Sequence, residues 1–270
     1  MGMSFLRVPG ARLYYEVHGS GPVLLMIPGG PADAGVFAGL AAYMADRYTV
    51  VPYDPRGNSR SALDGPPEDQ RMGVHGDDAA RLLAALGDQP AYVLGSSGGA
   101  QIGLNLAARY PGRVHTLVAH EPPCVGLLPD AAEQRAFVNA VYDTYRTHGV
   151  RPAMQKFAAG AGLRDGPQSP PPPEMREAFG RIMRNLDFFL AHGLQPISLY
   201  VPDVATLRAG PARLVVGVGE TSTGQLAHRT AVALAERLGT APVTFPGDHG
   251  GYGTQPAAFA EKLHRVLRGE

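Results

Sequence analysis

The stretch YVLGSSGGAQ, Tyr92 to Gln101, places two serines between glycines directly after an apolar run. The pattern G-x-S-x-G is satisfied with Ser97 at its centre. Ser96 fails, because the leading glycine of its frame would be Leu94. The pattern lies between an expected strand and an expected helix, where glycines allow a sharp turn that exposes the central hydroxyl at the helix N-terminus. Ser97 is therefore the candidate nucleophile. The alternative is an ordinary glycine-rich turn between a strand and a helix.

Short apolar strands and amphipathic helices alternate on both sides of this turn. The expected strands are 5–8, 12–17, 22–28, 48–54, 91–95, 114–120, 212–219 and 241–247, of which the first two form a hairpin. The expected helices between them are 34–45, 76–86, 99–109, 225–238 and 256–267. This alternation predicts an α/β fold whose mostly parallel sheet is covered by helices on both faces.

Residues 122–210 interrupt the alternation. They look helical, with apolar side chains at helical spacing, and they carry no strong strand signal. The stretch 165–173 contains four consecutive prolines, which predict an extended connection. Apolar helices over a sheet edge readily enclose a ligand pocket, so we interpret 122–210 as a cap and 1–121 with 211–270 as the core domain. The alternative is that these helices only complete the fold.

A serine hydroxyl needs a base to become a good nucleophile. His249 lies in a glycine-rich loop directly after the last expected strand. Because parallel strands end at one edge of a sheet, the loops after residues 95 and 247 can share a crevice. His120 competes by location, but the chain order Ser–acid–His favours the later histidine. His192 belongs to the expected cap and could only contact substrate.

Acyl chemistry also needs two backbone donors aimed at the developing negative charge. Gly98 follows the candidate nucleophile and supplies the first N–H group. Gly30, in the loop IPGGPAD after the third strand, is expected to supply the second. The alternative for Gly30 is a simple turn residue.

Four motifs, MIPGGP, DPRGNSRS, GSSGGA and GDHGG in this order, resemble those of the α/β-hydrolase superfamily over nearly the whole chain. The resemblance implies an eight-stranded, mostly parallel sheet, a helical cap inserted after the sixth strand, and Ser–acid–His catalysis. It supports Ser97 and His249 as the nucleophile and the base.

The acid departs from the common pattern. Most members carry Asp or Glu shortly after the seventh strand, but here that position is Ser222, with Glu220 close by. Glu121 in LVAHEPP follows Ser97 by 24 residues, at the end of the neighbouring strand. Haloalkane dehalogenases, cofactor-free ring-opening dioxygenases and zearalenone-type lactonases place the acid there, and the lactonase pattern is the most similar. We favour Glu121 over Glu220 as the acid. A buried structural glutamate is the alternative for Glu121.

The resemblance implies a serine hydrolase that cleaves a carboxylic ester or lactone of a small hydrophobic molecule through an acyl-enzyme. Two other functions stay open. One is a cofactor-independent oxygenase that uses the His–acid pair, and the other is a ligand-binding protein with little catalysis, which the displaced acid would allow. We expect no cofactor and no metal, because the sequence shows neither H-E-x-x-H nor a cluster of His and Asp.

The composition gives no sign of a nucleic-acid or membrane partner. The 24 basic residues balance the 24 acidic residues among 270, without the charge that binds nucleic acid or an anionic membrane. One cysteine, Cys124, excludes an intrachain disulfide and is expected to be a small buried residue. No signal peptide or membrane span is visible, so a cytoplasmic location is the expectation. Only Lys156 and Lys262 among the basic residues are lysine, a bias typical of GC-rich bacterial genomes.

Overall fold

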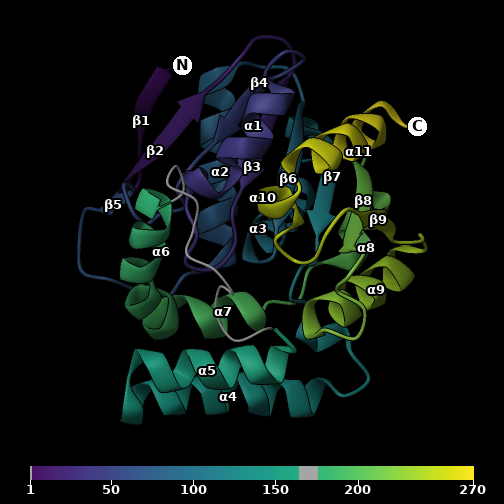
Figure 1. The fold of residues 1–270 in the computed structure, drawn as a ribbon. Coiled ribbons are helices and arrows are strands. Elements are labelled where there is room, and N and C mark those ends of the chain that lie inside the picture. The colour runs from purple at the N-terminus through teal and green to yellow at the C-terminus, as the bar shows by residue number, and fades with distance from the viewer. Residues whose placement is uncertain (1, 164–175) are drawn as a thin grey trace.

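The computed structural model describes residues 2–163 and 176–270, so the proline-rich stretch 165–173 lies outside the described residues (Figure 1). Within the described residues, a parallel sheet has the strand order β4-β3-β6-β7-β8-β9. Its strands are β3 (Val23–Ile27), β4 (Thr49–Pro52), β6 (Ala91–Ser96), β7 (Val114–His120), β8 (Arg213–Gly219) and β9 (Val243–Phe245). Because all six are parallel, the loops that follow them lie along one edge of the sheet.

The expected N-terminal hairpin consists of β1 (Gly2–Val8) and β2 (Ala11–Val17), which pair antiparallel. The two-residue strand β5 (Ala62–Leu63) adds to β2. Two isolated antiparallel bridges join this hairpin to the parallel sheet. Tyr15 pairs with Tyr53, directly after β4, and His18, directly after β2, pairs with Val50. The described strands thus form a parallel sheet of six strands and a small antiparallel sheet of three beside it, where the resemblance implied one sheet of eight strands.

Alternate residues of the strands pack on opposite faces of the sheet. Leu25 belongs to the larger apolar cluster, whose helices are α2 (Met72–Leu86), α3 (Gly98–Arg109) and α9 (Leu226–Leu238). Leu24 belongs to a second cluster, whose helices are α1 (Ala38–Met44) and α11 (Pro256–Arg268). The sheet thus has helices on both faces, as the alternation of elements predicts (Figure 1).

Several helices lie between β7 and β8, and all but the last are placed beyond the carboxyl ends of the strands (Figure 1). They are η3 (Val125–Leu127), α4 (Ala131–His148), α5 (Val150–Ala161), α6 (Arg176–Phe188), the π-helix η5 (Phe189–Gly193), α7 (Leu194–Ser198) and α8 (Val204–Ala209). α4, α5, η5 and α7 share an apolar cluster of their own, whereas α8 contacts α3 and α9. None of the described helices combines the length and the apolar character needed to cross a membrane.

Two helix boundaries differ from the sequence expectation. The helix expected over 34–45 is a 3-10 turn, η1 (Ala34–Phe37), followed by α1. The turn is stabilised by Asp33, whose side chain accepts a hydrogen bond from the backbone N–H of Gly35. α2 begins at Met72, four residues before Gly76. Its glycines lie inside the helix, where they allow close packing, since a Cβ on Gly76 would lie 2.2 Å from Oδ1 of Asn105 in α3. Short elements η2 (Pro111–Arg113) and α10 (Gly251–Thr254) complete the chain.

Candidate active site

Ser97 occupies the sharp turn between β6 and α3. Its backbone has φ +53° and ψ −122°, a strained conformation for a residue with a side chain, and its N–H donates to the carbonyl oxygen of His120 at 2.8 Å. Neighbouring segments approach too closely for side chains, since a Cβ on Gly99 would lie 2.0 Å from the carbonyl oxygen of Ile27. A Cβ on Gly95 would lie 2.4 Å from the carbonyl oxygen of Gly99. The glycines are therefore required by packing, and Ser97 stands at the N-terminus of α3.

Two unused backbone donors lie beside Ser97. In the described part of the chain, neither the N–H of Gly30 nor that of Gly98 donates a backbone hydrogen bond. They lie close together, because a Cβ on Gly98 would be 3.2 Å from the nitrogen of Gly30. Gly30 has φ +53°, a conformation that favours glycine. Paired free N–H groups can stabilise a negatively charged oxygen.

Glu121 is the first residue after β7, and its side chain is turned back toward the sheet edge. Its φ of +48° is unusual for a residue with a side chain, and the residue is fully buried. Oε1 accepts a hydrogen bond from the backbone N–H of Gly219 at 2.9 Å. Oε2 accepts one from Nδ1 of His249 at 2.6 Å. Both carboxylate oxygens thus have partners, as a buried charge requires.

Opposing effects act on the pKa of Glu121. Burial raises the pKa, but the hydrogen bond from His249, the charges of His249 and His120, and the N–H of Gly219 outweigh burial and lower it to about 2. The carboxylate is therefore ionised at neutral pH. By accepting from Nδ1 it fixes the imidazole so that Nε2 remains free to accept a proton. The side chain of His249 is 26% exposed, which leaves this nitrogen accessible from the cavity.

The alternative acid lies in a different environment. The side chain of Glu220 is exposed to solvent, while its backbone N–H donates to the carbonyl oxygen of Phe245 at 2.9 Å. Ser222, where the resemblance would place the acid, is fully buried. The structure therefore brings Glu121 to His249 and turns Glu220 away into solvent.

The other two candidate histidines do not join this contact. His120 is fully buried, and its ring packs edge-on against Phe245 and Phe259, with centroid distances of 5.8 and 5.5 Å. Among the described residues, neither ring nitrogen of His120 has a hydrogen-bond partner. Burial lowers its pKa to about 4. The Nδ1 atom of His192 lies 3.3 Å from Oδ1 of Asp69.

The neutral His120 predicts a loss of stability in acid. Between about pH 6.5 and pH 4 the unfolded chain binds a proton at this residue and the native protein does not, so the free energy of unfolding falls as the pH falls, by about 1 kcal/mol per pH unit. His120→Phe keeps an aromatic ring in the cluster and removes the titration. Urea unfolding at pH 7 and pH 5 is expected to show a smaller loss for the variant. Equal losses in both proteins would contradict a buried neutral His120.

A cavity of about 240 Å³ connects these groups with the helices beyond the sheet. Ser97, Gly30, Gly98 and His249 line one end of it. The rest is mostly apolar, with side chains that include Phe137, Val138, Met154, Phe157, Phe189 and Leu226. A larger hollow of about 380 Å³ is lined by Arg56, Arg71 and Arg81 and by none of those four site residues. Within the described residues, no group of three or more His, Cys, Asp or Glu side chains could hold a metal ion.

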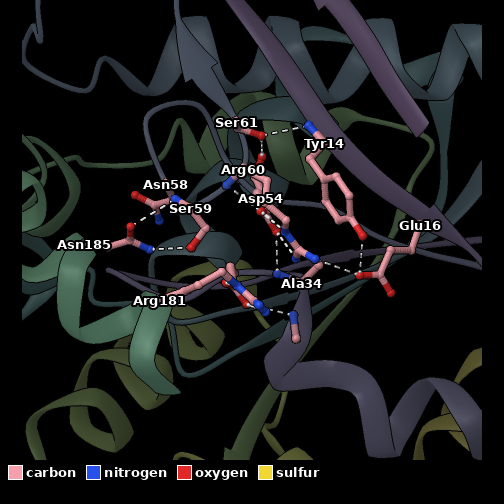
Figure 2. Close-up of polar contacts among 12 residues, drawn as sticks. Tyr14, Glu16, Ala34, Asp54, Asn58, Ser59, Arg60, Ser61, Arg181 and Asn185 are labelled. Atoms are coloured by element: carbon pink, nitrogen blue, oxygen red, sulfur yellow. Dashed lines mark hydrogen bonds and ion pairs between the residues drawn. The ribbon is translucent and has the colours of Figure 1, made fainter. Parts of the chain in front are cut away.

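The loop that carries Gly30 is held from the core side by polar contacts (Figure 2). The Nδ2 atom of Asn58 donates to the carbonyl oxygens of Gly30 and Ala32, both at 3.0 Å. The buried carboxylate of Asp54 accepts from the backbone N–H of Ala34 at 2.9 Å and pairs with Arg60 at 2.8 Å. These contacts fix both ends of the oxyanion loop, a name used here for residues 28–34.

Helix α6 holds the same loop from the other side. Nδ2 of Asn185 donates to the carbonyl oxygen of Pro31 and to Oγ of Ser59, both at 2.8 Å, and Oδ1 accepts from the N–H of Ser59 at 3.0 Å (Figure 2). Ser59 has φ +48°, so a strained turn depends on this amide. The guanidinium of Arg181 pairs with the buried Asp33. No local sequence pattern marks these contacts, because their partners lie more than 120 residues apart.

A serine at a strained turn between strand and helix, on a mostly parallel sheet, is the arrangement that defines α/β hydrolases. The chain belongs to the alpha/beta hydrolase fold family, whose model matches residues 22–158. "Uncharacterized hydrolase YraK" of Bacillus subtilis is 37% identical over 273 residues, which cover 98% of this chain and 96% of that protein. The family and this relative support a hydrolase.

Solved structures with low sequence identity share the fold. A thermophilic esterase from Thermogutta terrifontis is 20% identical, with a TM-score of 0.77 and coverage of 100% of this chain and 99% of that one. The enol-lactonase from Burkholderia xenovorans LB400 is 18% identical, with a TM-score of 0.69 and coverage of 99% and 100%. At these identities the likeness concerns the fold alone.

Proposed function

We propose that the protein is a serine hydrolase that cleaves a carboxylic ester or lactone of a small hydrophobic molecule. The observation that carries the proposal is the 2.6 Å contact between Nδ1 of His249 and Oε2 of Glu121, in a chain where His249 and Ser97 line the same cavity. Ser97 is the nucleophile, His249 the base and Glu121 the acid of the triad. Gly30 and Gly98 form the oxyanion hole.

The reaction proceeds through an acyl-enzyme. Oγ of Ser97 attacks the carbonyl carbon while Nε2 of His249 takes the hydroxyl proton, and the carbonyl oxygen becomes an anion that accepts from the N–H groups of Gly30 and Gly98. His249 then gives its proton to the alkoxide leaving group as the ester bond breaks. A water molecule then attacks the acyl carbon while His249 takes its proton. The bond between Oγ of Ser97 and the acyl carbon breaks, the acid is released, and His249 returns the proton to Oγ. Glu121 stays ionised throughout and stabilises the imidazolium.

The cavity supports a small and mostly apolar substrate. Its volume of about 240 Å³ is close to the lower end for ligand pockets, roughly 300–1,000 Å³. Its lining combines the site residues with apolar side chains from α4, α5 and η5. We propose that these helices, within residues 122–210, act as the cap that closes over the substrate. The fold shared with an esterase and an enol-lactonase is consistent with this class of reaction.

Labelling with a fluorophosphonate, read as intact mass, tests the proposal without knowledge of the substrate. The wild-type protein is expected to gain one adduct, and Ser97→Ala is expected to gain none, because only an activated serine reacts quickly with this reagent. Ser96→Ala, one residue away, is the matched control and should still be labelled. A wild-type protein that gains no adduct would overturn the serine-hydrolase proposal, and consumption of dioxygen by such a protein would point to the oxygenase instead.

A further inference from the structure

A second, smaller cavity lies on the other side of the oxyanion hole. Its volume is about 20 Å³, and Gly30 and Gly98 line it as they line the main cavity. Phe189 and Ile197 also line both cavities, so the two spaces adjoin at these four residues. We refer to this space, lined further by Gln70, His75 and Arg56 among others, as the polar chamber.

Two residues that line the polar chamber carry buried polar atoms without partners among the described residues. His75 is 3% exposed, and within the described structure neither of its ring nitrogens has a hydrogen-bond partner. Gln70 is 6% exposed; its Nε2 donates to the carbonyl oxygen of Glu68 at 2.9 Å, whereas its Oε1 has no partner among the described residues. Buried polar groups are costly unless they are hydrogen-bonded, and nearly all of them in folded proteins are. The chamber is therefore suited to a ligand that supplies these hydrogen bonds.

Size and charge define the chemistry of that ligand. A space of about 20 Å³ exceeds the roughly 10–15 Å³ that one water molecule needs, so it accepts one non-hydrogen atom with its hydrogens. Burial, together with the charge of Arg56, lowers the pKa of His75 to about 3, so its ring is neutral and offers one donor and one acceptor. The guanidinium of Arg56 already pairs with Asp78 at 2.7 Å, and its charge disfavours a cation nearby. A neutral hydroxyl group, which both donates and accepts, meets these conditions.

The wall of the chamber comes from the π-helix η5 and from α7. A Cβ on Gly193 would lie 3.0 Å from the ring of Phe189, so this glycine lets the ring pack across the helix. The carbonyl oxygen of His192 in the same segment accepts from the N–H of Gln70 at 2.8 Å. π-helical turns occur frequently at functional sites. Here the turn joins the segment that carries Gln70 to the wall beside the oxyanion hole.

We propose that the polar chamber recognises a hydroxyl group that the substrate carries close to its reacting carbonyl carbon. His75 and Gln70 are then specificity-determining residues that select hydroxylated acyl groups. This inference rests on the proposed hydrolase function, because Gly30 and Gly98 place the chamber beside the oxyanion hole. A water molecule has the same hydrogen-bonding chemistry, and the experiment distinguishes water from a substrate hydroxyl.

The test measures binding in a protein that cannot react. On a Ser97→Ala background, NMR titration gives the Kd of methyl butanoate and of the methyl esters of 2-, 3- and 4-hydroxybutanoate. At least one hydroxylated ester is expected to bind about tenfold more tightly than methyl butanoate, a typical gain for added hydrogen bonds. His75→Leu and Gln70→Met, which remove the free polar atoms at similar volume, should each reduce this ratio to near one. His148→Leu, at an exposed histidine that lines neither cavity, should keep the ratio.

The outcomes separate the two proposals. Equal affinities for all four esters on the Ser97→Ala background mean that the chamber holds only water, and they overturn the inference. A preference that survives both His75→Leu and Gln70→Met overturns it as well, because the hydroxyl is then recognised elsewhere. Failure of the hydrolase proposal is read independently, as a wild-type protein without a fluorophosphonate adduct.

Discussion

Glu121→Gln is expected to slow fluorophosphonate labelling of Ser97 by about 10³- to 10⁴-fold, whereas Glu220→Gln is expected to leave the rate unchanged. The amide of glutamine is neutral and cannot stabilise the imidazolium of His249. It also presents either an N–H group or a weaker acceptor to Nδ1, and the first of these favours the wrong tautomer. The contact that is lost is the 2.6 Å hydrogen bond, and Glu220 makes no such contact because its side chain faces solvent.

Thermal unfolding of both variants shows whether each of them is folded. Glu121→Gln retains an oxygen that can accept from the N–H of Gly219, so the turn after β7 should persist and the variant should unfold cooperatively. If Glu220→Gln were the slow variant while Glu121→Gln labelled at the wild-type rate, the acid would lie in the loop after β8. The contact between Glu121 and His249 would then be structural.

Asn185→Leu is expected to lower kcat for a carboxylic ester by about 100-fold with less than a threefold change in KM. The substitution removes the N–H donor to Pro31 and the polar partners of the strained Ser59, so the Arg181–Asp33 pair alone among the described polar contacts still joins the oxyanion loop to α6. Gly30 then moves relative to Ser97. Misplacement of a catalytic group by about 1 Å costs on the order of 10²-fold, and the oxyanion hole acts mainly on the transition state, so the loss falls on kcat.

Two further variants define the role of Asn185. Arg184→Leu changes an exposed neighbour on the same helix and should keep wild-type kinetics. Asn185→Asp keeps an oxygen that accepts from Ser59 but turns a carboxylate oxygen toward the carbonyl oxygen of Pro31, so its kcat should fall at least as far as that of the leucine variant. If Asn185→Leu instead raised KM at constant kcat, this residue would shape the substrate cavity rather than position the loop.

Most of the fold can be predicted from the alternation of strands and helices, because buried parallel strands are short, apolar and bounded by turns. The G-x-S-x-G turn and the loop of Gly30 are predictable from the local sequence, because glycine is required where backbone segments approach closely. The sequence distinguishes less clearly between Glu121 and Glu220 as the acid. Both follow a strand at the same edge, and only the positive φ of Glu121 turns its carboxylate toward His249. A single sequence does not state such a backbone angle.

Contacts distant in sequence could not be predicted at all. Asn185 pairs with Ser59 across 126 residues and with Pro31 across 154, and asparagine in an amphipathic helix carries no signal of its partner. The polar chamber is not predictable from the sequence for a related reason. His75 lies in a helix among apolar positions, where a histidine is compatible with ordinary packing, and its free nitrogens become visible only when the surrounding side chains are in place.

The attachment of α6 to the oxyanion loop has a consequence for selectivity against bulky substrates. An ester that is too large for the cavity would press on Phe189, the first residue of η5, which continues α6, and a shift of α6 would pull Pro31 and Asp33 with it. The N–H group of Gly30 would then leave its position while the ester is still bound. Such a molecule acts as a competitive inhibitor and not as a slow substrate, because the fit of its remote end decides whether the anion at its carbonyl can be stabilised.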